Sequence, residues 1–347
     1  MTKTAQQVHI YPPYEHVGAD RLHGWGRLAR PGQETLGEDL QRLTRDAALS
    51  RGLGRSYGDA SLPAQESDRI IGTVLADRIL SFDPDSGLLS AEAGLSLGEI
   101  SRLYWPRGYT CPTLPGTQYI TLGGMVASDV HAKDHHVDGC FSEHVDTVTI
   151  RVASGDVVHC SKHTFPELFW ATMGGMGLTG HILEVSVRLK RIPSAWVMQE
   201  STRVPNIDVF LDLLEEKKAD WPYSVGWIDC LKSGENMGRG ILMCGRWASP
   251  DEAPVNPPRK LRRKAVPLDF PSFSLNRLSV SAFNALYFAK HGARTRRDVI
   301  HPETFFHPLD AIKHWNRIYG KAGFTQYQCV VPRAAGAAGV KTMLAKM

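Results

Sequence analysis

The residues with the clearest chemical potential form a glycine-rich run from Arg51 to Asp59, with the sequence RGLGRSYGD. Three glycines within seven residues let the backbone curl so that successive N–H groups converge on one anion. Ser56 can add a hydroxyl, and Arg51 or Arg55 a positive charge. The spacing differs from the dinucleotide motif G-x-G-x-x-G, and no G-K-S/T of a P-loop follows. The run therefore predicts a loop that holds a diphosphate, with a tight structural loop as the alternative.

Two further segments follow at 114–117 (LPGT) and 121–131 (TLGGMVASDVH). Small residues from Gly123 to Ser128 leave room for a flat or bulky group, because no large side chain blocks its approach. A tightly packed core helix would need the same small residues. The segment 173–180 (MGGMGLTG) places four glycines just before a predicted strand, where they form either a linker or a backbone wall against a cofactor.

Ionisable side chains are concentrated at 131–136 (HAKDHH), directly after the small-residue run. Three histidines could indicate a metal site, but no carboxylate or cysteine at a usual ligand spacing completes one. The same side chains can serve as donors in a flavin or phosphate pocket. We therefore expect these residues to face a cofactor, and we expect no metal.

The pattern of apolar residues and turn residues predicts the elements that must position these segments. In the first half it predicts helices at 35–46 and 166–172, strands at 69–75 and 181–189, and hairpins at 79–82/88–93 and 146–153/156–160. In the second half it predicts helices at 206–218, 309–319 and 338–347, and strands at 224–230, 240–246 and 326–331. The sequence pattern changes around 191–205, which predicts a domain boundary there and two domains, 1–190 and 191–347.

Composition sets broad limits on the class of protein. A chain of 347 residues with 42% hydrophobic and 22% charged residues is a globular protein of about two domains. No run of ~18 apolar residues predicts a transmembrane helix, and the amino terminus lacks the features of a secretory signal. The six cysteines are scattered, without a C-x-x-C pair, so we expect reduced thiols and a cytoplasmic or membrane-peripheral location.

The net charge of +4 does not indicate a nucleic-acid-binding protein, but the basic residues are unevenly distributed. Residues 251–300 hold ten lysines and arginines against four acids, a local charge of +6, so the rest of the chain is slightly acidic. Aromatic and apolar side chains are interleaved with these charges. The mixture favours contact with an anionic membrane surface or a lipid phosphate, with solvated surface charge as the alternative.

The order and spacing of the motifs RGLGRSYGD, LPGT with TLGG, HAKDHH and ELFWATMGGMGLTG resemble the FAD-binding domain of the vanillyl-alcohol oxidase (PCMH) type. The resemblance extends from Gly24 to Pro332, nearly the whole chain. Within the family, the motifs are most similar to those of oxidases that act on decaprenylphosphoryl-ribose in the synthesis of cell-wall arabinan precursors. The resemblance implies an α+β fold, with a two-subdomain FAD-binding domain followed by a substrate domain built on an antiparallel sheet.

The resemblance also assigns residues to the cofactor. The FAD-binding positions that it implies are Arg51, Gly52, Leu53, Gly54, Arg55, Ser56, Tyr57, Gly58, Asp59, Gly116, Thr117, Thr121, Leu122, Gly123, Gly124, Ser128, His131, Ala132, Lys133, Asp134, His136 and Ile182. In relatives with covalently bound flavin, a histidine occupies the place that Arg55 holds here. We therefore expect FAD to be bound non-covalently.

The family's chemistry is hydride transfer from a carbinol carbon to flavin N5, while a base takes the hydroxyl proton. His131 and Lys133 are the candidate catalytic residues. The positions that match the family's substrate pocket are Trp227, Phe306, Gln326 and Gln328. The substrate implied is a polyprenyl-phosphate sugar oxidised at its 2′-hydroxyl, with a short-chain reductase as the partner that completes an epimerisation.

Members of the family continue past the point that corresponds to Met347, and that part supplies a catalytic lysine and more of the substrate sheet. We therefore expect the C-terminal part of the substrate domain to be missing here, with reduced turnover if the working protein also lacks the lysine. Two alternatives remain from the sequence. One is a sugar or aldonolactone oxidase of the same fold, and the other is a flavin-binding but catalytically incomplete fragment.

Overall fold

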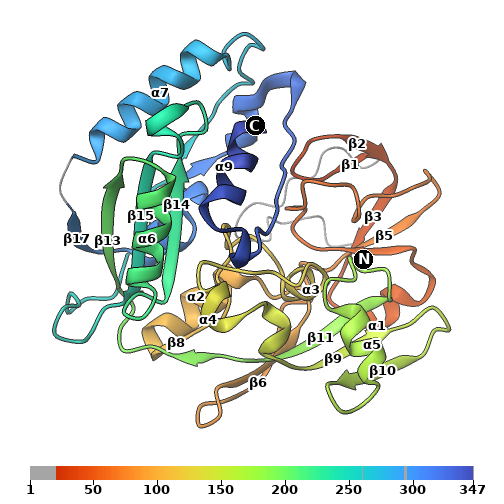
Figure 1. The fold of residues 1–347 in the computed structure, drawn as a ribbon. Helices are drawn as coiled ribbons and strands as arrows, with labels where there is room; N and C mark the ends of the chain where they lie inside the picture. Colours follow the sequence, from red (N-terminus) through yellow and green to blue (C-terminus); the bar gives the residue numbers. More distant parts are fainter. Residues whose placement is uncertain (1–20, 260, 293–294, 347) are drawn as a thin grey trace. The chain divides into compact units, whose positions relative to one another are not determined.

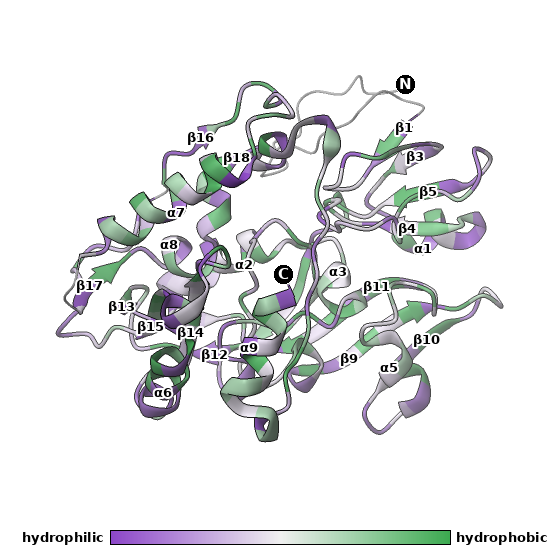
Figure 2. Ribbon diagram, turned by 45° about the horizontal axis from the view of Figure 1, so that its top comes forward, coloured by the Kyte–Doolittle hydropathy of each residue, from purple (hydrophilic) through white to green (hydrophobic). Residues whose placement is uncertain are grey.

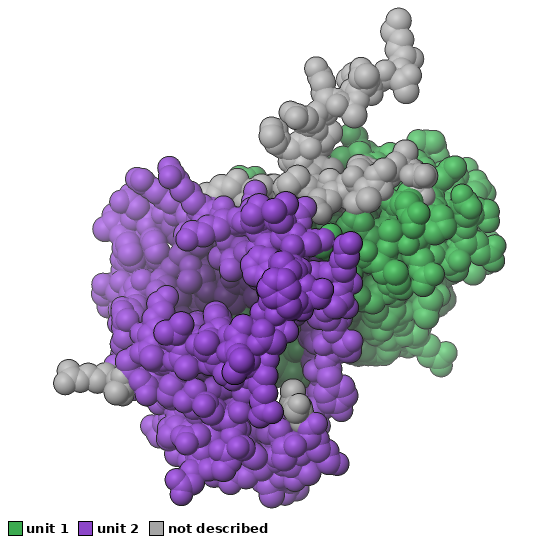
Figure 3. Space-filling model, turned by 90° about the horizontal axis from the view of Figure 1, so that it is seen from above, with its two compact units in different colours: residues 1–192 green, residues 193–347 purple. Residues whose placement is uncertain are grey.

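The computed structural model describes residues 21–259, 261–292 and 295–346. The chain divides into two compact units, Met1–Ile192 and Pro193–Met347, which Figure 3 shows in different colours. The sequence predicts an FAD-binding domain at 1–190 and a substrate domain at 191–347, and these domain roles stay a prediction. Lys260 and Arg294, which belong to the predicted basic segment, lie outside the described residues. Each unit has its own sheets and core and is described separately.

The main sheet of unit 1 is five-stranded and antiparallel throughout, in the order β10-β9-β11-β7-β6 (Figure 1). Its strands are β6 (Ile79–Asp83), β7 (Leu88–Glu92), β9 (Val145–Arg151), β10 (Val157–Ser161) and β11 (His181–Arg188). Both predicted hairpins are confirmed, and each turn contains a glycine with positive φ, Gly87 in the first and Gly155 in the second.

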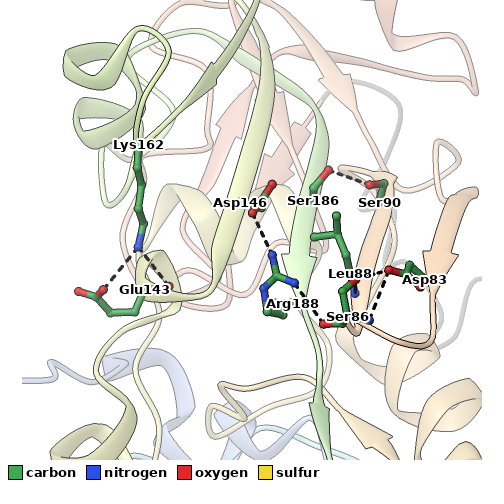
Figure 4. A network of polar contacts seen from close by, with 9 residues as sticks. All are labelled: Asp83, Ser86, Leu88, Ser90, Glu143, Asp146, Lys162, Ser186 and Arg188. Carbon is green, nitrogen blue, oxygen red and sulfur yellow. Dashed lines mark hydrogen bonds and ion pairs between the residues drawn. The ribbon is translucent and has the colours of Figure 1, made fainter.

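Polar contacts join the strands of this sheet at its exposed side (Figure 4). Arg188 on β11 donates to the Asp146 carboxylate on β9 and to the Ser86 carbonyl in the β6–β7 turn, both at 3.2 Å. Ser90 and Ser186 form a cross-strand hydroxyl pair at 2.8 Å. The hairpin is therefore fixed to the centre of the sheet by contacts beyond the backbone ladder.

A three-stranded parallel sheet, in the order β3-β5-β4, forms the second layer of unit 1. Its strands are β3 (Gln33–Leu36), β4 (Leu49–Arg51) and β5 (Arg69–Gly72). The helix predicted over 35–46 is wrong in its first part, because Thr35 and Leu36 pair with β5. The helical structure starts only after Asp39, whose side chain accepts from the Arg42 amide and caps the helix.

Short helices and strands complete unit 1. They are β1 (Arg21–His23), β2 (Ala29–Pro31), α1 (Leu40–Leu43), η1 (Thr44–Asp46), α2 (Leu97–Tyr104), η2 (Trp105–Arg107), β8 (Tyr109–Thr110), α3 (Leu122–Ala127), α4 (His135–Asp138), η3 (Phe141–Glu143), α5 (Pro166–Thr172) and β12 (Lys190–Arg191). The bounds of α5 are those the sequence predicts, since Pro166 starts the helix where its missing N–H costs nothing.

Unit 2 contains a four-stranded antiparallel sheet in the order β14-β15-β13-β17. Its strands are β13 (Val197–Val204), β14 (Tyr223–Ile228), β15 (Gly240–Trp247) and β17 (Arg296–Ile300). Helix α6 (Ile207–Lys217) packs on the sheet, and α9 (Gly336–Lys346) packs on α6 (Figure 1). Phe210, Leu242 and Leu344 meet in the resulting core. The predictions for these helices and for β14 and β15 are confirmed.

The remaining elements of unit 2 are η4 (Gly234–Asn236), β16 (Lys264–Ala265), α7 (Arg277–Lys290), α8 (Pro302–Phe306), η5 (Pro308–Ala311), β18 (Ile312–Lys313), η6 (Trp315–Ala322) and η7 (Arg333–Ala335). The helix predicted over 309–319 is wrong. Ile312 and Lys313 pair with β16, and His314 then adopts a left-handed conformation with φ 56°, which interrupts any helix.

The strand predicted over 326–331 is also wrong. These residues have no regular structure and no strand partner in the described part of the chain, and Tyr327 and Val330 are 76% and 87% exposed. An apolar pattern forms a strand only where a neighbouring strand can pair with it. Within the described ranges, no helix combines the length and the hydropathy needed to cross a bilayer.

Candidate functional site

The glycine-rich loop at 52–59 begins where β4 ends, and the buried Arg51 side chain anchors it. The Arg51 guanidinium donates to the His23 carbonyl at 2.7 Å and lies 3.4 Å from the Glu34 carboxylate. The two side chains are 5% and 2% exposed. The sequence predicts that Arg51 or Arg55 supplies a positive charge to a bound anion. In the structure the Arg51 guanidinium instead contacts the His23 carbonyl and the Glu34 carboxylate within unit 1. Glu34 has no recognisable signal in the sequence, because it lies 17 residues away on β3.

The segment around Trp25 packs directly on the loop backbone. The Trp25 amide donates to the Ser56 carbonyl at 3.0 Å. A Cβ atom on Gly24 or Gly26 would lie 2.9 Å from a loop carbonyl oxygen, so only glycine permits this approach. The Arg55 guanidinium lies 4.6 Å from the centroid of the Trp25 ring and 5.3 Å from that of Tyr119. These cation–π contacts fix the Arg55 side chain against two aromatic rings.

The loop itself retains the donors that a diphosphate needs. Among the described residues, no backbone hydrogen bond is donated by the amides of Leu53, Gly54, Ser56 or Gly58. Residues 52–56 are half-buried, and residues 57–59 are exposed. Gly54 has φ +64°, and a Cβ atom on Gly58 would meet nothing within 4 Å. Unused amides on an accessible glycine loop fit an anionic ligand.

The structure brings this loop against the start of α3. A Cβ atom on Gly52 would lie 2.5 Å from the Thr121 hydroxyl oxygen, so the two segments are in contact. Thr121 caps α3 by accepting from the Gly124 amide at 3.2 Å. The two runs are separated by about seventy residues of sequence and still lie side by side, as a shared cofactor requires.

Helix α3 divides its small residues between two tasks. Gly123 packs inward, since a Cβ atom there would lie 3.1 Å from Ala93 and 3.8 Å from the buried Ile182. Gly124 and Ser128 lie one turn apart and are exposed. Gly123 therefore serves core packing, and Gly124 and Ser128 leave an accessible face. The contact of that face with a cofactor stays a prediction.

The other two glycine segments lie in the same unit. Gly116 is exposed with open space around it, and the Thr117 hydroxyl accepts from the Tyr119 amide at 3.1 Å. In the segment 173–180, the amides of Gly174 and Met176 donate to the α3 carbonyls of Val126 and Ala127 at 3.0 and 2.8 Å. This segment therefore caps the C-terminal end of α3 and holds the helix in place.

The ionisable segment follows α3 directly. His131 is exposed, and its ring centroid lies 5.8 Å from that of His135, while Ala132 is half-buried and His136 exposed. Burial lowers the pKa of Lys133 to about 8, although the neighbouring Asp134 acts in the opposite direction. A substantial fraction of this amine is therefore neutral near physiological pH, as a proton acceptor requires.

Asp134 is 1% exposed, and no protein donor in the described residues reaches either carboxyl oxygen. Burial and the adjacent Asp138 raise the pKa of Asp134 to about 7. A protonated Asp134 can donate to Asp138, whose own charge is paired with Lys190. Sequence reasoning assigned Asp134 to the cofactor but missed Asp138 and Lys190. The i, i+4 spacing of the two carboxylates could have indicated Asp138, whereas Lys190 is distant in the sequence and gives no such signal.

The predicted substrate residues lie in unit 2, on elements with different degrees of burial. Trp227 is half-buried on β14, with its ring 4.9 Å from Tyr287. Phe306 has no exposed surface and packs edge-on against Tyr223 at 4.9 Å. A substrate could reach Phe306 only if the aromatic side chains packed against it, such as Tyr223, moved away. Gln326 and Gln328 are exposed on the irregular segment 323–332. The pocket role of these four residues stays a prediction.

Comparison with known proteins agrees with this geometry. The model of the family "FAD binding domain" matches residues 38–161, which include the glycine loop, α3 and the ionisable segment. Decaprenylphosphoryl-beta-D-ribose oxidase of Mycolicibacterium smegmatis is 32% identical over 338 residues, covering 91% of this chain and 72% of that protein. D-arabinono-1,4-lactone oxidase of Yarrowia lipolytica is 25% identical over 174 residues, covering 47% of this chain and 32% of that protein. L-gulonolactone oxidase of Scyliorhinus torazame is 26% identical over 112 residues, covering 32% and 25%.

The fold and the loop geometry thus define an FAD-dependent oxidoreductase with an α+β architecture. The chain belongs to the PCMH-type family of FAD-binding proteins that includes decaprenylphosphoryl-β-D-ribose oxidase. The predictions of the family, of the fold class and of FAD as the cofactor are confirmed.

Proposed function

We propose that this protein oxidises the 2′-hydroxyl of a polyprenyl-phosphate pentose, with decaprenylphosphoryl-ribose as the best candidate. The observation that carries the proposal is the extent of the likeness to the M. smegmatis oxidase, which covers 91% of the chain and so includes most of unit 2. The two lactone oxidases align with less than half of the chain. Similarity that extends beyond the flavin-binding half supports a shared substrate class, because substrate contacts in this family come from the second domain.

Residues of unit 1 have distinct tasks in this proposal. FAD, when bound, accepts the hydride. The amides of Leu53, Gly54, Ser56 and Gly58 hold the diphosphate, and the accessible face of α3 at Gly124 and Ser128 leaves room for the flavin. Lys133 takes the hydroxyl proton, because burial lowers its pKa to about 8. His131 is the second candidate for this role and is already exposed.

We also propose that FAD is held without a covalent bond. The place that carries the flavin-linked histidine in some relatives is Arg55, and a guanidinium cannot form that bond. Its cation–π contacts with Trp25 and Tyr119 support a structural role instead. Acid precipitation should release all of the flavin into the supernatant. Yellow colour retained in the protein pellet would contradict non-covalent binding.

The reaction would yield a keto sugar that is still attached to the lipid phosphate. A short-chain reductase that returns this ketone to a hydroxyl of the opposite configuration would complete an epimerisation and supply arabinan precursors. This partner is part of the proposal. It is supported by the chemistry of the product, because an isolated 2′-ketone is useful for inversion only if a second enzyme reduces it.

An aldonolactone oxidase is the second candidate. Its support is that lactone oxidases are among the proteins to which part of the chain is similar. The two candidates differ in whether the substrate carries a lipid phosphate. They are therefore separable by substrate alone, with the same protein and the same flavin readout.

The test is reduction of the bound flavin by substrate under anaerobic conditions. The loss of the flavin's visible absorbance measures this reduction. Purified protein loaded with FAD should bleach with decaprenylphosphoryl-ribose and not with ribose, arabinono-1,4-lactone or gulonolactone. Bleaching by a lactone would establish the second candidate. Flavin that binds but is bleached by none of them would contradict both oxidase proposals and favour a catalytically incomplete chain. Dithionite reduction in each sample provides the control that the flavin is reducible.

A further inference from the structure

Helix α7 in unit 2 has a mixed inner side, on which Asn284 is buried and the aromatic Tyr287 and Phe288 are half-buried, and an exposed side that carries large apolar side chains. The Asn284 side chain is buried and donates to the Asp229 carboxylate at 2.7 Å. Asp229 also pairs with Arg239 at 2.8 Å, so a polar network holds the inner side of the helix. A helix of a soluble protein normally buries its apolar side.

The outward side of α7 carries large apolar side chains. Leu278, Phe283 and Leu286 are 83%, 60% and 73% exposed. Ala282, Ala285 and Ala289 lie between them and are exposed as well. Figure 2 shows apolar residues along much of the helix. A single exposed apolar side chain is common on a protein surface. Several of them on one side of a helix form a patch, and such patches are typical of contact surfaces.

The chain before α7 extends this apolar surface. Leu268, Phe273 and Leu275 are 75%, 79% and 44% exposed. Asn276 caps α7 in a capping box with Ser279, and the Ser279 hydroxyl also donates to the Ser274 carbonyl at 2.7 Å. These bonds fix residues 273–275 to the first turn of α7, so Phe273 and Leu275 continue the exposed surface of the helix.

Positive charge surrounds the apolar surface. Arg277 and Lys290 stand at the two ends of α7, and Arg262 and Lys264 are exposed earlier in the chain. Residues 251–300 carry a net charge of +6, while the remainder of the chain is slightly acidic. Arg263, Arg296 and Arg297 are left out of this set, since they pair with Glu303, Asp298 and Glu200. Apolar side chains flanked by cations match an anionic lipid headgroup layer above an acyl interior.

We propose that α7 and residues 268–276 form a docking surface for an anionic lipid bilayer. Leu278, Phe283, Leu286 and Phe273 enter the boundary between headgroups and acyl chains, and Arg277 and Lys290 contact the lipid phosphates. We choose a bilayer over a protein partner because an anionic headgroup layer above acyl chains complements both the cations and the large exposed apolar side chains of this surface. The inference does not depend on the proposed reaction: bilayer binding can be measured without substrate, and flavin bleaching without a bilayer.

The test is flotation of the FAD-loaded protein with vesicles. Binding should be strong with phosphatidylglycerol-rich vesicles and at least tenfold weaker with pure phosphatidylcholine. The triple variant Leu278→Ser, Phe283→Ser, Leu286→Ser should lose at least tenfold in binding to the anionic vesicles. Arg277→Gln with Lys290→Gln should weaken binding and reduce its dependence on salt. Leu178→Ser is the matched control, because Leu178 is 83% exposed like Leu278 but lies in unit 1.

The variants keep their flavin absorbance and circular dichroism if they fold, so loss of binding is not confused with unfolding. Equal binding of the triple variant and the unmodified protein to anionic vesicles would overturn the proposal. So would a concentration-dependent dimer that binds no vesicles and becomes monomeric in the triple variant, since the surface would then be an interface between two copies of the chain. Binding to both vesicle types at the same strength would remove the assigned role of the cations.

Discussion

Lys133 and Asp134 are adjacent in the sequence, and burial shifts both of their pKa values toward the neutral form. The pKa of Lys133 falls to about 8 and that of Asp134 rises to about 7. Burial disfavours charge on either group, and the charge of Asp138 adds to the effect on Asp134. Two neutralisable groups beside a cofactor loop are a recognised sign of a functional site. Both groups give pH-dependent predictions.

Replacement of Lys133 by Met should slow flavin reduction by the substrate about 10²- to 10⁴-fold, the range for loss of a general base. In the unmodified protein the reduction rate should rise with pH through about 8, as the amine loses its proton. The variant should lack this rise. Stopped-flow absorbance under anaerobic conditions measures both effects. Lys162→Met is the control, because Lys162 pairs with Glu143 on the surface of unit 1 (Figure 4). An unchanged pH profile in Lys133→Met would assign the proton to another group, with His131 next in order.

Replacement of Asp134 by Asn should alter the pH dependence of stability. The unfolded carboxyl loses its proton near 3.8, whereas the folded one keeps it until about 7. The folded state therefore binds more protons between these values, and the free energy of unfolding falls as pH rises through this window. Asn cannot ionise, so the variant should lose this slope and be more stable above pH 7 by on the order of 2 kcal/mol. Urea unfolding at several pH values measures the difference.

Asp146→Asn serves as the control for this series, since Asp146 lies at the surface and pairs with the exposed Arg188. A slope that is equally steep in Asp134→Asn and in the unmodified protein would show that Asp134 does not carry the proton.

At the scale of elements, the candidate site depends on the contact between the glycine loop and α3. Gly52 lies against Thr121, and Thr121 caps the helix. The predicted turns placed the hairpins and α5 correctly, because Pro, Asp and Gly act through local dihedrals. The predicted helix at 309–319 and strand at 326–331 failed because His314 adopts a left-handed conformation and residues 326–331 find no strand to pair with. Pairing partners are a property of the fold and cannot be inferred from a short apolar pattern.

Two glycine substitutions should separate packing from cofactor contact. Gly52→Ala introduces a Cβ atom 2.5 Å from the Thr121 oxygen, so it should lower both stability, by about 1–3 kcal/mol, and FAD affinity. Gly58→Ala meets nothing within 4 Å in the protein, so it should leave apoprotein stability nearly unchanged and weaken FAD binding alone. Thermal unfolding of apoprotein and fluorescence titration with FAD provide the measurements. Normal FAD affinity in Gly58→Ala would show that the ligand does not approach that side of the loop.

At the scale of the whole molecule, the chain is two units with separate sheets, and the residues assigned to FAD all lie in unit 1. The core of unit 2 is built by its own elements, among them α6, β15 and α9. Ligand binding stabilises the part of a protein that forms the site. The two units should therefore respond differently to the cofactor.

FAD at about one hundred times its Kd should stabilise unit 1 by about 2.7 kcal/mol, while the unfolding of unit 2 shifts little. Differential scanning calorimetry should resolve a transition that moves to higher temperature with FAD and one that stays in place. Gly58→Ala should reduce the movement at the same FAD concentration. Equal movement of both transitions would indicate that the units unfold together.

The sequence by itself determined the family, the cofactor, the hairpins and the location of the glycine segments, because each depends on local dihedrals or on motifs whose order is specific. Only the tertiary structure decided what the individual side chains do. It turned Arg51 inward to Glu34, placed Gly123 against the core while leaving Gly124 exposed, and set Lys190 beside Asp138. It also showed that α7 buries Asn284 against Asp229 and leaves Leu278, Phe283 and Leu286 exposed. These outcomes depend on residues that are distant in the chain, so burial and partners, rather than residue type, fix the charge and the accessibility of each group.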